Sequence, residues 1–511
     1  MNTERIATAI VIPRANPPGV RLLAVALSVG CWPAGRPSAD PPAASAAFTS
    51  GDPLVVAARG LLDDGDLSDI ERMLRNEPRV GDVPARDELA EIVRRLRHEY
   101  ALDQDGLAAA ARAVVPDATD DELGAWVREA RLESRTIDGR RLFHRRAPQN
   151  LFLFSTTARG RRDAFRPPEP QAWSLVDHVR AACAEAQRTG ATEVLPVHQR
   201  VTHTITVEPG HPAIRPGARV KAWLPFPQET ALQRDVRLVE AGPGEARIAP
   251  PGRLDPAADG CLQRTVFLET VVADPPQPLV FREIFEFVSW AFCPDLEEAL
   301  AAPLPAGWGT AYLGERPPHI VFTPEIRRQV EELVGDEPNP LVRARRIFRW
   351  VSRAIPWHAE DEYSTIPSLA VRGFKARRGD CGVQNTVFVT MCRIAGIPAR
   401  WQSGFQTRPD VGIGMHDWAE IHVAPWGWIP ADASYGIQAA DDPRIADFFC
   451  GGRDSHRLIV NLDWGRELCP PVVALRSEPA DFQRGEVEVD GRNLYFDGWS
   501  SRTTVERLPT P

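Results

Sequence analysis

The stretch GDCGVQNTVFVTMCRIAGIPARW contains two cysteines in different surroundings. Cys381 stands where an apolar periodic segment begins, and Cys392 lies inside that segment. The apolar spacing predicts a helix over 381–395 with Gly396 as its C-terminal cap. Free N–H groups and the macrodipole at a helix start favour an anion, and the thiolate is the nucleophilic form of cysteine. The pattern therefore predicts a nucleophile at Cys381 and a core residue at Cys392.

A nucleophilic thiol needs a base and a group that orients the base. MHDWAEIHV predicts a strand with His416 near its start, APWG predicts a turn, and WIPADAS predicts a returning strand with Asp432 near its end. In an antiparallel pair hinged at that turn, the two side chains lie within a few residues of directly opposite, so an imidazole–carboxylate hydrogen bond is feasible. Such a carboxylate fixes the histidine tautomer and stabilises the imidazolium. Cys381, His416 and Asp432 are thus a candidate catalytic triad.

Each of these residues also has a structural explanation when it is taken alone. A cysteine at a helix start is more often structural than catalytic, His416 could be a satisfied strand histidine, and Asp432 could form a turn. His422 lies on the same strand nearer the turn, and Asp417 is expected to point to the opposite face of the sheet from its neighbour His416. Asp380 precedes the cysteine, where an acid can cap the helix but opposes thiolate formation. The three residues in this order outweigh the separate explanations.

The elements that must position these residues predict a multidomain α+β protein. Residues 313–440 are expected to form the core that carries the triad, with one helix beginning at the N-cap and proline pair Asn339-Pro340. The short β-like pieces in 441–511 are expected to complete the antiparallel sheet of that core. The candidate residues would then lie in one compact unit.

Residues 51–196 are typical of a mostly helical domain with a hairpin. A capping box runs from Thr119 to Glu122, and Asp138-Gly139 marks the hairpin turn. Helices followed by a hairpin could indicate a winged DNA-binding module, but acidic residues are frequent here and no basic recognition helix is evident. A helical structural or docking domain is favoured.

Residues 197–312 change to a β pattern with Pro and Gly turns, which predicts a sandwich-like domain. In RVTHTITVEP, the residues Val201, His203 and Ile205 alternate with threonines, as in a half-buried strand. His203 and His211 raise the question of a metal site. No third ligand is spaced with them, so a solvated strand face is favoured.

Composition limits the classes of partner. The 511 residues include 60 Lys and Arg against 69 Asp and Glu, a net charge of −9, and no basic stripe with interleaved aromatic residues stands out. Nucleic acid is therefore not an expected partner. The eight cysteines form no CxxC pair or regular framework, so neither a zinc site nor a disulfide scaffold is indicated. A pairing such as Cys450 with Cys469 stays open if the protein is exported.

Residues 1–50 contain a candidate export signal and a Pro/Ala linker. Arg21 is followed by the apolar run LLAVALSVG and by Cys31; the run is too short to span a bilayer but fits the h-region of a signal peptide. LSVGC is also similar to a bacterial lipobox, although Ser28 stands where leucine is usual. Export to the cell envelope, with a lipid anchor at Cys31 as one route, is favoured over a disordered cytoplasmic leader.

Residues 323–436 resemble the transglutaminase-like superfamily of papain-like cysteine enzymes. The matching pieces are GDCGVQNTVFVTMCRIAGIPARWQSGF, HDWAEIHV and GWIPADASYG. The resemblance implies a papain-like α+β core in which Cys381, His416 and Asp432 are the catalytic residues. It also implies that the β-rich stretch upstream is the accessory domain often found in bacterial members.

Two features depart from the commonest pattern of that family. Asp417 takes the place of the small residue that usually follows the histidine, and Gln384 and Asn385 occupy positions that are often acidic or apolar. None of these residues is expected to touch the triad. All of them are expected to alter the cleft.

The resemblance implies acyl transfer through a thioester. The Cys381 thiolate would attack an amide carbonyl with His416 as base and then acid, and the backbone N–H of Cys381 is a candidate oxyanion donor. Trp357, His358 and Tyr363 precede the nucleophile and are candidates to line the substrate cleft, although aromatic residues there can equally be core. No metal or organic cofactor is required.

The expected activity depends on which molecule accepts the acyl group. Water gives a peptidase or amidase, and a lysine amine gives a cross-linking transglutaminase, with the same triad in both. The lack of a D-x-[DN]-x-[DN]-G calcium loop and the bacterial-looking accessory domain favour hydrolysis of a protein or peptide substrate. A non-catalytic binding module is the third possibility, against which the intact triad argues.

Overall fold

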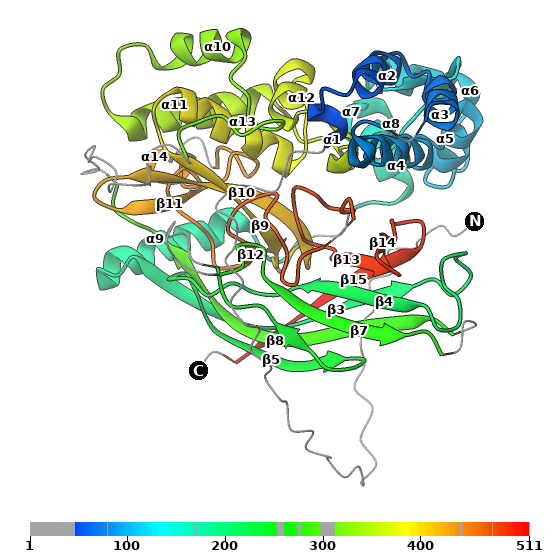
Figure 1. The fold of residues 1–511 in the computed structure, drawn as a ribbon. Coiled ribbons are helices and arrows are strands. Elements are labelled where there is room, and N and C mark those ends of the chain that lie inside the picture. Colours follow the sequence, from blue (N-terminus) through cyan, green and yellow to red (C-terminus); the bar gives the residue numbers. More distant parts are fainter. Residues whose placement is uncertain are drawn as a thin grey trace.

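The computed structural model describes residues 46–509 except 79, 169–170, 253–259, 274–276, 297–311, 439–441 and 473. Helices form an upper tier, one sheet lies beneath part of them, and two further sheets form the base (Figure 1). All pairs of named strands are antiparallel. The predicted α+β class with antiparallel sheets is confirmed.

The predicted leader and linker fall mostly outside the described residues, Cys31 included. The last residues of that segment instead form helix α1 (Ala46–Thr49), which packs on α4 (Val83–Glu99). Ala47 is buried in this contact. The predicted linker is therefore wrong at its C-terminal end, because Ala47 and Phe48 pack against the helical domain.

The helical domain agrees with its sequence signals. It contains α2 (Pro53–Asp64), α3 (Leu67–Asn76), α5 (Gln104–Arg112), α6 (Asp120–Glu129), α7 (Ala147–Phe154), α8 (Thr156–Phe165) and the hairpin of β1 (Arg135–Ile137) and β2 (Arg140–Leu142). The capping box is present, since Thr119 Oγ1 accepts from the Glu122 N–H at 3.2 Å and Glu122 Oε2 accepts from the Thr119 N–H at 2.9 Å. Asp138 and Gly139 form the turn with positive φ angles of 47° and 76°.

Helix α9 (Leu175–Thr189) does not belong to that helical domain, although the predicted range 51–196 included it. It lies at the left of the view, between the middle sheet and the lower sheets (Figure 1), and contacts β3. Its buried face carries Val179, which joins the core of the middle unit, and Ala182, which packs with Val194 and Ala291 of the lower sheets. The amphipathic pattern predicted the helix but not the partner of its apolar face.

The base is a sandwich of two sheets, as predicted. One has the order β14 (Arg492–Asn493), β13 (Glu486–Val489), β4 (Arg219–Pro225), β7 (Thr265–Val271), β6 (Arg247–Ile248), and the other the order β15 (Trp499–Leu508), β3 (Glu193–Val207), β8 (Leu279–Phe292), β5 (Gln233–Gly242). The solvated face predicted for His203 is wrong, because its ring is buried. His203 Nδ1 lies 2.8 Å from Thr503 Oγ1, and Nε2 lies 3.0 Å from the Arg484 carbonyl oxygen. The ring is therefore covered by β15 and by the C-terminal loop, the segment 462–485 that precedes β13.

The C-terminal strands divide between two units, which corrects the prediction that 441–511 completes the core. Strand β12 (Arg457–Asn461) pairs with β9 (Ala399–Gln406) in the middle sheet. In contrast, β13 pairs with β4 and β15 pairs with β3. The sequence of a short strand does not indicate which strand it pairs with. Here β13 and β15 form their backbone hydrogen bonds with strands of the sandwich.

The core places one long buried helix against the middle sheet. The sheet has the order β11 (Gly427–Ala431), β10 (Gly414–Val423), β9, β12, and helix α13 (Cys381–Ile394) contacts β9 and β10. Helix α13 also contacts α10 (Pro324–Val334), α11 (Pro340–Ala354) and α12 (Leu369–Ala376). The same unit contains η1 (Tyr363–Thr365) and α14 (Pro443–Ala446). Asn339 caps α11 by accepting from the N–H groups of Leu341 and Val342, as predicted.

One disulfide joins the sandwich to the C-terminal loop. Cys261 is bonded to Cys469, whereas Cys450 is a buried free thiol. The pairing of Cys450 with Cys469 left open by the sequence is therefore wrong. Cys450 is enclosed in the core of the middle unit, where it forms an isolated β-bridge with Ala431 of β11.

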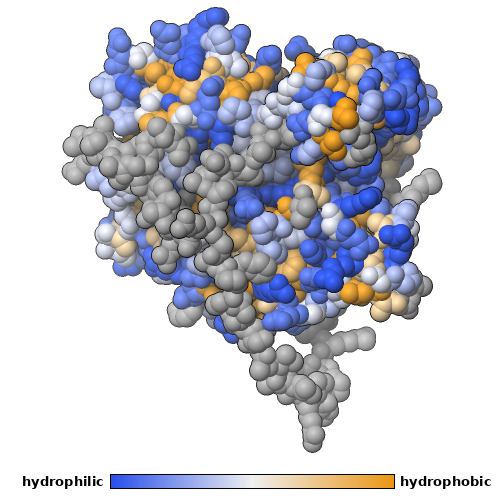
Figure 2. Space-filling view, in the orientation of Figure 1, coloured by the Kyte–Doolittle hydropathy of each residue, from blue (hydrophilic) through white to orange (hydrophobic). Residues whose placement is uncertain are grey.

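The surface in Figure 2 is largely hydrophilic, with hydrophobic clusters over the helices of the upper tier. Within the described ranges, no helix combines the length and the apolar character needed to cross a bilayer.

The close contact between α12 and α13 gives a stability prediction. A Cβ on Gly373 would lie 2.6 Å from Val383 Cγ1 and 2.9 Å from Val387 Cγ2. We expect Gly373→Ala to lower the free energy of unfolding by about 1–3 kcal/mol, because the two helices must move apart. Gly60→Ala in α2 is the control, since a Cβ there meets nothing within 4 Å. In urea denaturation, Gly60→Ala should be neutral or slightly stabilising. Equal stability of Gly373→Ala and Gly60→Ala would contradict the packing argument.

Candidate active site

Helix α13 begins at Cys381, as its sequence pattern predicts. The Asp380 carboxylate caps the helix by accepting from the Val383 N–H at 3.1 Å. Cys381 is partly exposed and lines a cavity of about 360 Å³, whereas Cys392 is fully buried in the core. The two cysteines therefore occupy the two environments that the sequence assigned to them.

His416 and Asp432 meet across the hairpin of β10 and β11. Ala419 is paired with Ala431, and His416 Nε2 lies 2.7 Å from Asp432 Oδ2 just beyond that pair. Burial opposes the ionisation of Asp432, but the contacts with His416 and with the Arg457 guanidinium outweigh it and hold the pKa of Asp432 well below its usual range. Asp432 is thus a carboxylate that can fix one imidazole nitrogen as an N–H donor.

The imidazole of His416 is fixed on its other sides as well. Its ring centroid lies 4.6 Å from that of Tyr435 and 5.9 Å from that of Trp418. Burial lowers the pKa of His416, although Asp432 opposes this. The ring is therefore held in one plane and is neutral near neutral pH. With Nε2 bonded to Asp432, Nδ1 is the nitrogen left to accept a proton.

Arg457 completes the back of the site, and sequence reasoning missed it. Its Nη1 lies 2.7 Å from Asp432 Oδ2, and its Nε donates to Asp454 Oδ2 at 2.9 Å. The arginine comes from β12, on the far edge of the sheet from β11. The number of residues between Asp432 and Arg457 does not predict their contact, because the contact depends on the order of strands in the sheet.

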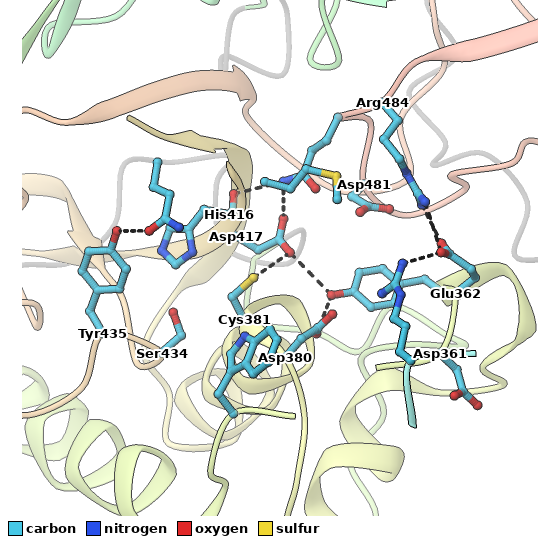
Figure 3. Close-up of a pocket in the computed structure, with 16 residues that line it drawn as sticks. Asp361, Glu362, Asp380, Cys381, His416, Asp417, Ser434, Tyr435, Asp481 and Arg484 are labelled. Carbon is cyan, nitrogen blue, oxygen red and sulfur yellow. Dashed lines mark hydrogen bonds and ion pairs between the residues drawn. The ribbon is translucent and has the colours of Figure 1, made fainter. Parts of the chain in front are cut away.

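Asp417 does not point away from the site, which corrects the prediction from strand alternation. The Cys381 thiol donates to Asp417 Oδ2 at 3.4 Å, and Figure 3 shows the sulfur directed at that carboxyl group. Gly382 makes the approach possible, since a Cβ there would lie 2.8 Å from Asp417 Oδ2 and 2.0 Å from the Tyr363 hydroxyl. Without a side chain at this position, β10 comes close enough for His416 and Asp417 to line the same cavity.

The surroundings of Cys381 reverse the expected effect of the helix start on its thiol. Burial, followed by the negative charges of Asp417 and Asp380, raises the pKa of Cys381 well above its ordinary value. The N–H groups of the first turn favour a thiolate, but one of them is already capped by Asp380. In this geometry the thiol is protonated and bonded to Asp417.

Asn385 ties together the three segments that carry the candidate triad. Its amide donates to the carbonyl oxygens of Cys381 at 2.9 Å and Asp417 at 3.0 Å, and its Oδ1 accepts from the Ala433 N–H at 3.1 Å. Gln384 lies apart and donates to the Ile355 carbonyl oxygen at 2.6 Å. The expectation that Asn385 and Asp417 do not touch the triad is therefore wrong, while that for Gln384 agrees with the structure.

The aromatic candidates for the cleft separate in the structure. Trp357 and Tyr363 line the cavity, and Trp357 is 39% exposed. The Tyr363 hydroxyl donates to Asp380 Oδ1 at 2.6 Å. His358 is buried and does not line the cavity; its Nε2 lies 3.0 Å from Asn150 Nδ2 in α7. The strand-like alternation around 357–358 turns one side chain to the cavity and the next to the helical domain.

The helical domain and the C-terminal loop both supply walls of the cavity. Arg146, the N-cap residue of α7, reaches in from the helical domain, and Asp481, Gln483 and Arg484 come from the loop before β13. Gln483 Nε2 donates to Asp417 Oδ1 at 2.9 Å and to the His416 carbonyl oxygen at 3.0 Å. Sequence reasoning found none of these residues, since they lie outside the matched motif.

The cavity does not have the geometry of a metal centre. In the described part of the chain, no three His, Cys, Asp or Glu side chains are grouped so that they could hold a metal ion. The chemistry that the described side chains can support is that of a thiol, an imidazole and a carboxylate.

Comparison with known proteins points to the segment of the chain that carries the site. Residues 327–433 match the family model of the transglutaminase-like superfamily. An uncharacterised protein of Haemophilus influenzae is 27% identical over 144 residues, and the aligned part covers 23% of this chain. The chain spans only 38% of the length of that relative.

Solved structures show weaker likenesses. A crystal structure from Cytophaga hutchinsonii, named as a candidate cysteine protease, is 13% identical with a TM-score of 0.41, and the match covers 62% of this chain and 93% of that one. The periplasmic domain of TgpA from Pseudomonas aeruginosa is 13% identical with a TM-score of 0.25, over 54% of this chain and 96% of that one. Both TM-scores are low, so the assignment rests on the family match. Residues 327–433, which contain Cys381 and His416 and extend to Ala433, form a domain of the transglutaminase-like superfamily.

Proposed function

We propose that the protein is a cysteine hydrolase that cleaves amide bonds in a protein or peptide through a thioester on Cys381. The observation that carries the proposal is the 2.7 Å contact between His416 Nε2 and Asp432 Oδ2 on the wall of the cavity that the Cys381 thiol enters. Nucleophile, base and orienting carboxylate come from α13, β10 and the end of β11. This is the minimum set for nucleophilic catalysis by a thiol.

The proton path follows from the hydrogen bonds. His416 Nδ1 takes the thiol proton, while Nε2–H stays bonded to Asp432, which stabilises the imidazolium. The thiolate adds to the amide carbonyl carbon, and the backbone N–H of Cys381 at the start of α13 supports the oxyanion. The C–N bond breaks as His416 returns the proton to the leaving amine. Water then adds to the thioester, and the acid product leaves with the thiol restored.

The resting contact of the thiol requires one rearrangement before attack. The thiol hydrogen is directed at Asp417 Oδ2, so the sulfur must turn from Asp417 towards His416 when a substrate enters. Rotation about one side-chain bond is fast compared with enzyme turnover. Asp417 therefore holds the nucleophile in its protonated, unreactive form between turnovers.

The disulfide supports an extracytoplasmic location. Cys261 and Cys469 are bonded, and such bonds persist in oxidising compartments and are rare in the cytosol of mesophiles. We propose the cell envelope as the place of action. A peptide or protein substrate found there is consistent with a polar cavity that opens to solvent.

Replacement of the nucleophile tests the proposed reaction. We expect Cys381→Ala to lower the turnover of a peptide library by at least about a thousandfold, as removal of a catalytic nucleophile does. Cys183→Ala, which changes a thiol on α9, is the matched control and should keep the parental rate. Mass spectrometry of the products, with an added alkylamine, distinguishes cleaved acids from amine conjugates. Conjugates without cleavage would indicate a transamidase, and no Cys381-dependent product would indicate a binding module.

Replacement of Asp417 tests the state of the thiol. Ionising Cys381 places a second negative charge beside Asp417, and Asp417→Asn removes that repulsion. We expect the apparent pKa of the thiol to fall by about one unit, which raises the alkylation rate about tenfold at any pH below that pKa. Iodoacetamide rates at Cys381, measured across pH by peptide mass spectrometry, give the value. An unchanged pKa would contradict the role assigned to Asp417.

A further inference from the structure

The cavity beside Cys381 has an imbalance of charge. Five carboxyl groups line it, from Asp361, Glu362, Asp380, Asp417 and Asp481. The arginines that line it are Arg146 and Arg484. A buried carboxylate requires a hydrogen-bond or ion-pair partner. The partners of each of these charged groups therefore decide which kind of ligand the cavity can bind.

Both arginines are already bound to the same carboxylate. Arg146 Nη2 lies 2.5 Å from Glu362 Oε1, and Arg484 Nη2 lies 2.5 Å from Glu362 Oε2. Arg484 Nε is in addition 2.5 Å from Glu478 Oε1. The positive charge of each guanidinium is therefore already paired with a carboxylate of the protein rather than available for an anionic substrate.

Three of the remaining carboxyl groups also have partners. Asp361 accepts from the Tyr100 hydroxyl at 2.5 Å, and Asp380 accepts from the Tyr363 hydroxyl at 2.6 Å. Asp417 accepts from Gln483 at 2.9 Å. The positive charge of Arg146 also acts on Asp380, and His144 Nε2 lies 3.7 Å from Asp361 Oδ1. Asp417, by contrast, is held by the neutral donors Gln483 and Cys381.

Asp481 is the exception. The residue is only 9% exposed and lines the cavity. Its carboxyl group accepts from its own backbone N–H and feels the positive charge of Arg484, but among the residues that the structure describes no other residue donates a hydrogen bond to it or forms a direct ion pair with it. Figure 3 shows this carboxyl group beside Asp417 at the same opening. Burial, followed by the charge of Glu478, raises the pKa of Asp481, and burial followed by the charge of Asp481 raises that of Asp417. A cation between the two carboxyl groups would supply a partner to Asp481 and a positive charge beside Asp417, whose donors are neutral.

The loop that carries Asp481 is held rigidly. Two residues later, Gln483 Nε2 donates to the carbonyl oxygens of Gly404 and His416 at 2.9 and 3.0 Å. The carboxyl group is thus preorganised for a ligand, because little conformational freedom is lost on binding.

We propose that Asp481 and Asp417 form a subsite for an ammonium group on the substrate that Cys381 attacks. The inference rests on the proposed hydrolase function and names the substrate class for that site. An ammonium fits the site because it offers three donors to carboxyl groups on different elements. The exposed side chains of Trp357 and Met415 also line the cavity and can cover an aliphatic stem. A peptide amino terminus and a lysine side chain are the two sources of this group.

The first test uses small thiol reagents and needs no substrate. Cys381 is treated with cationic aminoethyl methanethiosulfonate or with neutral methyl methanethiosulfonate, and each rate is divided by that of a free thiol. The cation-to-neutral ratio should be above one in the parent and should fall about five- to tenfold in Asp481→Asn, since the attraction to the ammonium is lost. Asp63→Asn, an exposed carboxylate on α2, is the control for the loss of one charge and should keep the parental ratio.

An equal ratio in the parent and in Asp481→Asn overturns the inference, whether or not any amide is cleaved. Peptide mass spectrometry assigns the adduct to Cys381 rather than to the other free thiols. Circular dichroism of each variant confirms that the fold is retained.

The second test identifies the source of the ammonium. Matched peptides carry it at the amino terminus alone, on a lysine side chain alone, or, after acetylation, at neither position. We expect kcat/KM to be about tenfold higher for one charged peptide than for the neutral one, and Asp481→Asn to remove that preference. Equal cleavage of all three overturns the inference. If none is cleaved while the reagent ratio behaves as expected, the hydrolase proposal fails and the ammonium subsite stands.

Discussion

The close approach of strand β10 to the first turn of helix α13 is the constraint on which the site depends. It requires the absence of a side chain at Gly382, because a Cβ there would lie 2.0 Å from the Tyr363 hydroxyl. Asn385 then bonds the first turn to β10 and to the segment after β11. The helix behind this turn is buried along nearly its whole length, so hydrophobic packing rather than a loop fixes the position of the sulfur.

Charge is distributed unequally around this contact. Asp432 is ionised because His416 and Arg457 lie against it, whereas burial and neighbouring carboxylates raise the pKa of Asp417 and Asp481. Separate environments thus give similar carboxyl groups different tasks, as in other acid–base sites. In the reaction we propose, one orients the base, one holds the resting thiol, and one receives the ammonium of the substrate. The cavity would then combine a preorganised triad with a nucleophile that is inactive at rest.

Local patterns in the sequence predicted the parts of the site that local structure determines. The helix start at Cys381, the hairpin that joins His416 to Asp432, and the core position of Cys392 all follow from periodicity and turn residues. Strand alternation failed at Asp417, since its reach to the thiol depends on how closely helix and strand approach. Arg457, Gln483 and Asp481 were missed because they arrive from another strand and a distant loop, and no local spacing encodes such contacts. The same reason explains why β13 and β15 were assigned to the wrong sheet.

The C-terminal loop and strands have a consequence for the order in which the protein matures. Asp481, Gln483 and Arg484 sit on the cavity wall, and β13 and β15 hold their loop by pairing with strands made early in synthesis. During synthesis on the ribosome, the helix, the histidine strand and the aspartate strand all emerge before this loop. A nascent chain therefore carries the Cys381 thiol with one wall of the cavity missing. Completion of the cavity coincides with closure of the sandwich, so a partly made chain lacks the surface that would select a substrate.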